Sequence, residues 1–171
     1  MTGRDALPID ITLILAEPSR TGIQRVERQL IRHWPGPRPL RPIAFDANRR
    51  AMVALPQRIL AQVQEDALPP EAGTPIGSFP AIDPKCILNP ELFWDPGRAA
   101  YYRDLHVRGG RSAWIIYDFF PVLRPESYPS GTGAYCFDHY RALRTVPFPI
   151  FISTRTREDY RRIMRGNGPE G

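Results

Sequence analysis

The hydrophobic pattern near the N-terminus predicts a strand followed by a helix. Residues 9–16, "IDITLILA", are nearly all apolar, as is typical of a parallel strand that is buried on both faces. After Thr21 and Gly22 the apolar residues recur at the three- and four-residue spacing of a helix, at Ile23, Val26, Leu30, Ile31 and Trp34. The chain therefore opens with a strand–turn–helix unit.

Later segments continue this alternation of strands and helices. Apolar runs and helical spacing predict strands near 40–45, 86–88, 112–117 and 149–152, and helices near 56–65, 97–107, 133–144 and after Ser153. Asp95 followed by Pro96 marks one helix start, and Gly109–Gly110 marks the end of that helix. The alternation predicts a single α/β domain of the Rossmann-like type, with a doubly wound, mainly parallel sheet and helices on both faces.

Length and composition fit one domain over residues 1–171. The chain has 171 residues, of which 42% are hydrophobic, enough for one core of ordinary size. Residues 64–84 are rich in proline and glycine and predict a long loop within the domain. A loop of this length inside a compact domain is often functional or mobile.

The charge pattern argues against a nucleic-acid partner. The chain has 23 basic and 18 acidic residues and a net charge of +5, but its arginines alternate with carboxylates, as in "RVER". The sequence contains no long apolar run and no signal-peptide core, which predicts a cytoplasmic protein. Peripheral contact with the inner membrane surface stays open, because the net charge suits anionic lipid.

Neither a metal nor a bound cofactor is expected. Cys86 and Cys136 match no metal-ligand spacing, and His33, His106 and His139 are isolated in the sequence. The glycine motifs of self-sufficient dinucleotide and ATP sites are absent from the sequence.

The turn at Thr21–Gly22 is the first candidate binding site. A helix N-terminus carries unpaired N–H groups and a partial positive charge, and glycine allows close approach of the backbone, so this turn could hold a phosphate. Gln24 and Arg25 could add polar contacts. The alternative is that Thr21 only caps the helix and Gly22 only eases the turn.

The second candidate is the pair Tyr117–Asp118, at the end of the most apolar predicted strand. Doubly wound folds bind ligands beyond the carboxyl ends of their strands, and a carboxylate there can orient or deprotonate a hydroxyl group. Asp118 is therefore the candidate catalytic residue, with Tyr117 as a wall of the site. The alternative for Asp118 is a turn or capping role before Phe119.

Four more polar residues follow predicted strands and are candidate substrate contacts. Asn89, with the nearby Glu91, could line an acceptor pocket. Ser153 and Arg155 follow the last strand, where a helix start could face an anion. For Ser153 helix capping is the alternative.

Four segments occur in the order, and at about the spacing, seen in one enzyme family: "TGIQRVERQL", "NPELFWDP", "IIYDFFPVLRPESYP" and "FISTRTREDYRRI". Together they resemble the N-terminal domain of the GT-B glycosyltransferases of family four. Such enzymes have two Rossmann-like domains that face a cleft; the first mostly binds the acceptor, and the second binds the nucleotide sugar. This chain is similar to the first domain, and we expect the donor-binding domain to be absent.

The resemblance implies a function and roles for the candidate residues. It implies the acceptor-binding half of a retaining hexosyltransferase, of the kind that builds bacterial polysaccharide on a glycan or lipid-linked acceptor. The N–H groups after Thr21–Gly22 would face the donor's diphosphate, and Asp118 would contact the acceptor hydroxyl. Many members of the family have a histidine near the position of Tyr117, and this chain has none there.

The resemblance also implies partners. A sugar acceptor is expected to bind this domain, and a nucleotide sugar only together with a second domain, which a separate chain could supply. Alone, the domain would be half an enzyme. The alternative is a non-catalytic module, or a remnant of a truncated gene, that docks a partner through the cleft face.

Overall fold

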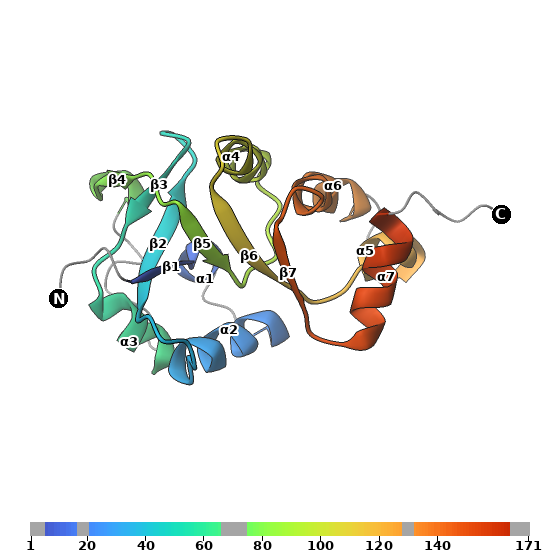
Figure 1. Ribbon diagram of the computed structural model, residues 1–171, viewed down its shortest axis with the longest axis horizontal. Helices are drawn as coiled ribbons and strands as arrows, with labels where there is room; N and C mark the ends of the chain where they lie inside the picture. Colours follow the sequence, from blue (N-terminus) through green and yellow to red (C-terminus); the bar gives the residue numbers. More distant parts are fainter. Residues whose placement is uncertain (1–5, 17–20, 66–74, 128–131, 165–171) are drawn as a thin grey trace.

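A computed structural model of the chain describes residues 6–16, 21–65, 75–127 and 132–164 (Figure 1). Its centre is a seven-stranded sheet with the order β4-β3-β2-β1-β5-β6-β7. The strands are β1 (Leu7–Asp10), β2 (Leu40–Asp46), β3 (Ala51–Ala54), β4 (Ala81–Ile82), β5 (Cys86–Asn89), β6 (Arg111–Ile116) and β7 (Phe148–Phe151). The helices are α1 (Thr12–Ala16), α2 (Gly22–Arg32), α3 (Arg58–Gln64), α4 (Pro96–Val107), α5 (Phe120–Leu123), α6 (Thr132–Leu143) and α7 (Thr154–Met164), with short 3₁₀ helices η2 (Ile76–Ser78) and η3 (Pro125–Ser127).

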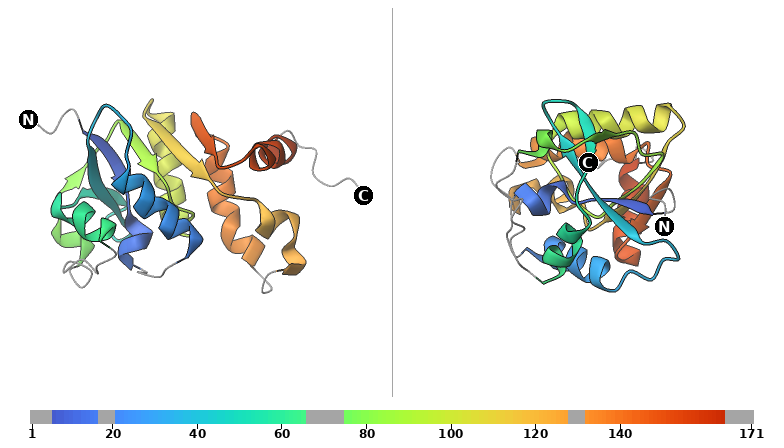
Figure 2. Two further views of the ribbon diagram at one scale, coloured as in Figure 1. Left: turned by 90° about the horizontal axis from the view of Figure 1, so that it is seen from below. Right: turned by 90° about the vertical axis from the view of Figure 1, so that its left-hand side faces the viewer.

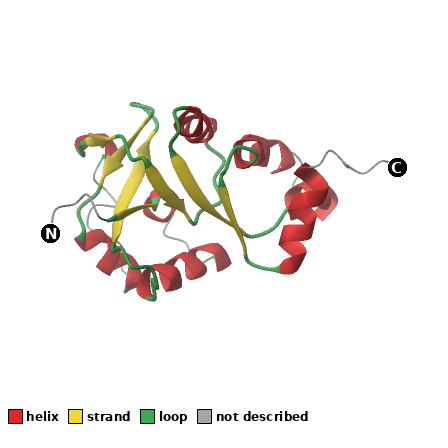
Figure 3. Ribbon diagram, viewed as in Figure 1, coloured by secondary structure: helices red, strands yellow, loops and turns green. Residues whose placement is uncertain are grey.

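Helices cover both faces of the sheet (Figures 1 and 3). Helices α4 and α6 lie side by side on one face, called here the α4 face, and α2 and α3 lie together on the other, called the α2 face. Strands β1, β2, β5, β6 and β7 pair in parallel. The predicted Rossmann-like, doubly wound arrangement is therefore confirmed.

One edge of the sheet is antiparallel, which the sequence pattern did not predict. Strand β3 pairs antiparallel with β2, with Met52 opposite Phe45, and β4 pairs antiparallel with β3. In the turn between β2 and β3, the carboxylate of Asp46 accepts the N–H of Asn48 at 3.0 Å, and Arg50 has a left-handed φ of 50°. The run "AMVA" is too short for its pattern to distinguish a strand from a helical segment.

The first strand is earlier and shorter than the prediction for residues 9–16. Strand β1 ends at Asp10, and the next segment forms the short helix α1. A helix can begin there because its first N–H groups have acceptors: Asp10 accepts from Thr12 at 3.2 Å, and Glu91 accepts from Leu13 at 2.8 Å. The strand prediction was wrong for this segment because apolar periodicity cannot reveal an acceptor so distant in the sequence.

Caps define the ends of α2 and α4. Thr21 and Gln24 form a capping box at the start of α2, and Asp95 accepts the N–H of Arg98 at 3.1 Å at the start of α4. Helix α4 ends next to Gly109, whose φ of 80° suits glycine. The predicted starts of both helices and the predicted end of α4 are confirmed.

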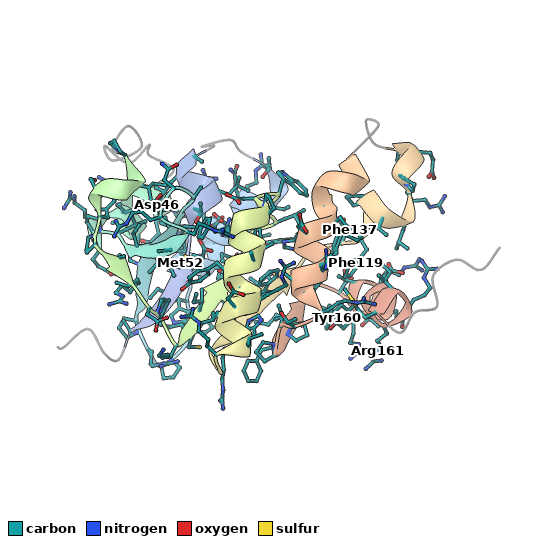
Figure 4. The ribbon with its side chains drawn as sticks, turned by 90° about the horizontal axis from the view of Figure 1, so that it is seen from above. Asp46, Met52, Phe119, Phe137, Tyr160 and Arg161 are labelled. Atoms are coloured by element: carbon teal, nitrogen blue, oxygen red, sulfur yellow. The ribbon has the colours of Figure 1, made fainter. Side chains whose placement is uncertain are left out.

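Two hydrophobic clusters fill the space between sheet and helices. On the α4 face, Trp114 of β6 is fully buried and packs against Tyr102 of α4, with ring centroids 4.9 Å apart. The second cluster joins β1 and β2 to α3, with Ile59 fully buried within it. Figure 4 shows the α4 face, where Tyr160 of α7 meets Phe119 at a centroid distance of 6.2 Å. Helix α7 is thus anchored on this side of the sheet.

The predicted loop at 64–84 lies partly outside the described residues, which omit 66–74. The described part contains η2 and strand β4. Its second half is therefore partly regular in structure, and the prediction of a long loop is untested for the rest.

Candidate functional site

The switch point of the sheet lies between β1 and β5. From β1 the chain passes to β2 through α2 on one face, and from β5 it passes to β6 through α4 on the other face (Figure 1). Because the two connections diverge, sheets of this type have a crevice at the carboxyl ends of these strands, and ligands commonly bind there. The residues at the two ends are Asp10 and Asn89.

Side chains of the protein itself occupy this crevice. Arg98 of α4 is 2% exposed; its Nε donates to Asp10 Oδ2 at 2.9 Å, and its Nη2 donates to Glu91 Oε2 at 2.5 Å. The hydroxyl of Tyr102 donates to the same oxygen of Asp10 at 2.7 Å. The guanidinium also lies over the ring of Phe93, 4.3 Å from its centroid. We call these four hydrogen-bonded residues the Arg98 network: Asp10, Glu91, Arg98 and Tyr102.

Glu91 takes the position that a ligand anion could occupy at the start of α1. Its Oε1 accepts the N–H groups of Leu13 and Ile14 at 2.8 and 3.0 Å. A helix start attracts negative charge because its first N–H groups have no partners within the helix. An internal carboxylate therefore closes the crevice.

Glu27 of α2 is a further buried carboxyl group beside the Arg98 network. It is 0% exposed, and within the part of the chain that the structure describes neither of its oxygens has a hydrogen-bond partner. Burial, and then the charges of Glu91 and Asp10, raise the pKa of Glu27 well above its ordinary value. An unpartnered carboxyl group in the interior is more stable with its proton, so burial favours the neutral form of Glu27.

The negative charge of the site rests instead on Asp10 and Glu91. Burial raises the pKa of Glu91 to about 7, although Arg98 acts in the opposite direction. Glu91 has the donors that stabilise an anion, namely the guanidinium and two main-chain N–H groups, whereas Glu27 has none of these. Asp10 and Glu91 thus share one guanidinium, whereas Glu27 has no hydrogen-bond partner among the described residues.

The predicted turn at Thr21–Gly22 starts α2 with a capping box. The hydroxyl of Thr21 accepts the N–H of Gln24, and the side-chain oxygen of Gln24 accepts the N–H of Thr21, both at 3.3 Å. Gln24 is buried, so it supports the helix start from inside. A Cβ added at Gly22 would meet nothing within 4 Å, and Arg25 is exposed. Gly22 and Arg25 therefore face open space and remain candidate contacts.

Asp118 follows β6, and within the described residues one of its carboxylate oxygens has a donor and the other has none. Its Oδ1 accepts the N–H of Phe120 at 3.1 Å, so the turn role that the sequence allowed is observed. The side chain is half-buried, and no donor within the described ranges bonds to Oδ2. Tyr117 is buried, and its hydroxyl donates to the carbonyl of Pro90 at 2.7 Å, which makes it a wall of the edge. Burial also raises the pKa of Tyr117.

The other predicted contacts have structural roles. Asn89 is fully buried, and its Oδ1 accepts the N–H of Glu91 at 3.2 Å, so the expectation that it lines an acceptor pocket is not met. Ser153 accepts a main-chain N–H at 3.0 Å and thereby caps α7. Arg155 is exposed and pairs with Asp159 at 3.0 Å.

Tyr117, Asp118 and Ser153 come together at one edge of the sheet. The hydroxyl of Thr156 donates to the carbonyl of Tyr117 at 3.0 Å and ties the start of α7 to the end of β6. We call the ends of β5, β6 and β7, with the loops that follow them, the strand-end edge.

The sequence analysis missed the Arg98 network and Glu27. One signal was present, because Asp10 interrupts an otherwise apolar run, and an aspartate in such a run needs a buried partner. The partner itself, Arg98, could not be identified, since it lies 88 residues further along the chain.

A hollow of about 650 Å³ lies elsewhere, on the outer flank of α4. Its lining combines Arg50 and Arg108 with Asp83 and Asp104. Opposite charges compensate one another there, as Arg108 and Asp83 do at 3.7 Å. The hollow therefore offers no excess charge to an ionic ligand.

Searches for metal sites, membrane spans and relatives add no candidate. Among the described residues, no group of histidine, cysteine, aspartate and glutamate is placed to hold a metal ion. No helix in the described ranges is long and apolar enough to cross a membrane. Comparisons with models of protein families, with curated proteins and with solved structures found no match for this chain. The geometry by itself supports a Rossmann-like α/β domain whose switch point is closed by its own charges and whose strand-end edge carries the half-buried carboxylate of Asp118.

Proposed function

We propose that this domain binds the acceptor in glycosyl transfer from a nucleotide sugar, with Asp118 directed at the acceptor hydroxyl. The observation that carries the proposal is the half-buried carboxylate of Asp118 at the end of a parallel strand, whose Oδ2 has no donor among the described residues. A carboxylate in that place can orient a hydroxyl group or accept its proton. The motifs that resemble family-four enzymes favour retaining hexosyl transfer to a glycan or lipid-linked acceptor.

Donor binding requires a second domain, on the same or on a separate chain. The crevice between β1 and β5 is occupied by the Arg98 network, so this fold does not offer a nucleotide its usual place. Gly22 and Arg25 face open space and could contact a diphosphate that another domain holds. The domain alone is proposed to bind acceptor and to transfer no sugar.

A second candidate function is the docking of a partner through the strand-end edge. Three large apolar side chains beyond β5 and β6 are exposed: Trp94 by 43%, Phe120 by 53% and Val122 by 42%. Exposed apolar groups at one edge favour a protein contact. Both candidates place a second domain or chain there, and they differ in whether the edge also binds a sugar.

NMR titration of the isotope-labelled chain distinguishes the two candidates. We expect short oligosaccharides and glycosides from a test panel to shift the amide signals of Tyr117 and Asp118, and Asp118→Asn to remove the shift at Tyr117. The matched control is Asp104→Asn, which changes an exposed aspartate of α4 and should leave the titration unchanged. If no sugar of the panel moves these signals, the acceptor proposal fails and docking is favoured.

A further inference from the structure

The helices cover the two faces of the sheet unequally. On the α4 face, α4 and α6 pack over β5, β6 and β7, whereas α2 and α3 lie over the opposite half of the sheet on the other face. In the view from below, no described helix passes in front of β6 and β7 (Figure 2, left). Within the part of the chain that the structure describes, the α2 face of these two strands therefore has no helix layer.

This bare face is apolar. Side chains alternate along β7, and the residues that point to the α2 face are exposed: Phe148 by 51%, Ile150 by 48% and Ile152, just after the strand, by 56%. Ile115 of β6 pairs with Ile150 and is only half-buried. We call this surface the β7 face, and its residues are Ile115, Phe148, Ile150 and Ile152.

The β7 face borders the existing core. Ala113 precedes Ile115 by two residues on the same face of β6, and it packs against the core cluster to which Leu30 of α2 also belongs. The apolar surface thus begins where the cover of α2 ends. A run of exposed aliphatic and aromatic groups next to a formed core is typical of a surface that another element covers.

The outer edge of β7 is unsuited to pairing with an added strand. The N–H of Ile152 donates to the carbonyl of Ile116 at 3.3 Å, so the main-chain groups of Ile150 and Ile152 point inward to β6 and those of Pro149 and Phe151 point outward. Pro149 has no N–H to offer at that edge. A partner must therefore contact the β7 face rather than the β7 edge.

Charge selects the kind of partner. Arg111 lies on the α2 face at the start of β6, and Arg144 precedes β7; both are exposed. At the other end α7 carries four arginines and two acidic residues. A second copy of the chain would bring the same basic groups together, whereas an acidic partner would complement them.

We propose that the β7 face binds an amphipathic helix of a separate polypeptide, with an apolar stripe toward Phe148 and Ile150 and acidic residues along its flanks. A helix is the element that would extend this layer, because α2 and α3 already cover the same face of the neighbouring strands. This proposal concerns a face of the sheet that shares only Ile152 with the strand-end edge, and it does not depend on the proposed function.

The probe is a fluorescent synthetic helix of about 18 residues, roughly five turns. It has leucine at positions i, i+3, i+4 and i+7 and glutamate on its flanks, and its controls are a scrambled peptide of equal composition and a version with lysine for glutamate. We expect saturable binding of the glutamate peptide in fluorescence anisotropy. The lysine version should bind at least about tenfold more weakly, a difference of about 1.4 kcal/mol.

Variants locate the binding on the β7 face. Ile150→Ser and Phe148→Ser should each weaken binding about tenfold, with the fold checked by circular dichroism, since both positions are half-exposed. The control Val107→Ser removes a side chain of α4 that is 85% exposed, and it should have no effect.

Four outcomes of the binding and sedimentation measurements would overturn the proposal. They are no saturable binding, equal binding of the scrambled peptide, an equal effect of Val107→Ser, and self-association in sedimentation that Ile150→Ser abolishes, which would identify a second copy as the occupant. Binding to vesicles of phosphatidylcholine and phosphatidylglycerol that Ile150→Ser abolishes, without peptide binding, would identify a lipid surface and would also overturn it.

Discussion

Arg98 of α4 and Asp10 at the end of β1 are 88 residues apart in sequence, and the Nε of one lies 2.9 Å from the carboxylate of the other. Both side chains are removed from water, and Glu91 uses the same guanidinium. The arginine therefore compensates two buried negative charges at the centre of the sheet.

Removal of this arginine should be severely destabilising. We expect Arg98→Met to lower the free energy of unfolding by about 3–5 kcal/mol in urea denaturation, because it leaves Asp10 and Glu91 buried without a counter-charge. The control Arg108→Met changes an arginine that is 54% exposed and lies 3.7 Å from Asp83, so its effect should stay below about 1 kcal/mol. Similar losses for the two variants would contradict the role assigned to Arg98.

Glu27 should make stability depend on pH. Since the pKa of Glu27 is higher in the folded than in the unfolded chain, the folded state is favoured below about pH 4.5 and loses this advantage as the pH rises through the raised value. Between about pH 5 and pH 8 the parent should lose at least about 1 kcal/mol more stability than Glu27→Gln, which cannot release a proton. Unfolding in urea at each pH measures this, with Glu65→Gln, at an exposed position, as the control. Parallel pH profiles of parent and Glu27→Gln would show that Glu27 is not the titrating group.

Asp118→Asn tests the proposed acceptor site in the presence of a donor domain. The amide oxygen can still accept the N–H of Phe120, so the melting temperature should not change. The loss of the carboxylate should lower sugar transfer by about 10²-fold. Arg25→Ala is the comparison, since a residue near the diphosphate should raise the KM for the donor instead. Transfer by Asp118→Asn within a few-fold of the parent would remove Asp118 from the site.

Gly22→Ala separates a binding role from a structural one. Nothing lies within 4 Å of the added Cβ, and alanine favours a helix, so we expect stability to be unchanged or higher by about 0.5 kcal/mol. If the start of α2 approaches a diphosphate, the same change should raise the KM for the donor about tenfold. An unchanged KM for the donor would show that Gly22 has only a structural role, in the turn before α2.

The matched comparison is Gly110→Ala. Its Cβ would meet the side chain of Leu105 and, at 2.9 Å, the carbonyl oxygen of the same residue. Thermal denaturation should therefore show a loss of about 1–3 kcal/mol. Equal melting temperatures for Gly110→Ala and the parent would show that the end of α4 can relax.

The predictable parts of the fold are those with local causes. Asp95 and Pro96 start α4 through groups within three residues, and Gly109 ends it through its own backbone conformation, so the sequence pattern was sufficient. Helix α1 was missed because Glu91, from another strand end, provides its cap. The antiparallel β3 and β4 were missed because they have four and two residues, too few for periodicity.

The candidate site also contains residues that the local sequence could predict and residues that depend on distant partners. Strand ends could be located, so Asp118 was correctly expected to follow a parallel strand. Whether a polar side chain at such an end points outward or inward depends on partners that only the fold brings near. Asn89 was expected in a pocket and lies instead in the interior, where its side-chain oxygen accepts hydrogen bonds from the main chain of Glu91 and from Arg98.

The pairing of Arg98 with Asp10 has a consequence for protein synthesis. A ribosome that has made the first half of the chain has released Asp10 but not the arginine that makes its burial tolerable. Strand β1, in the middle of the sheet, then cannot pack stably, because Asp10 has no counter-charge until α4 leaves the exit tunnel. A translational pause before Pro96 would leave a nascent segment that is rich in apolar side chains and cannot close over them, and chaperones would recognise it.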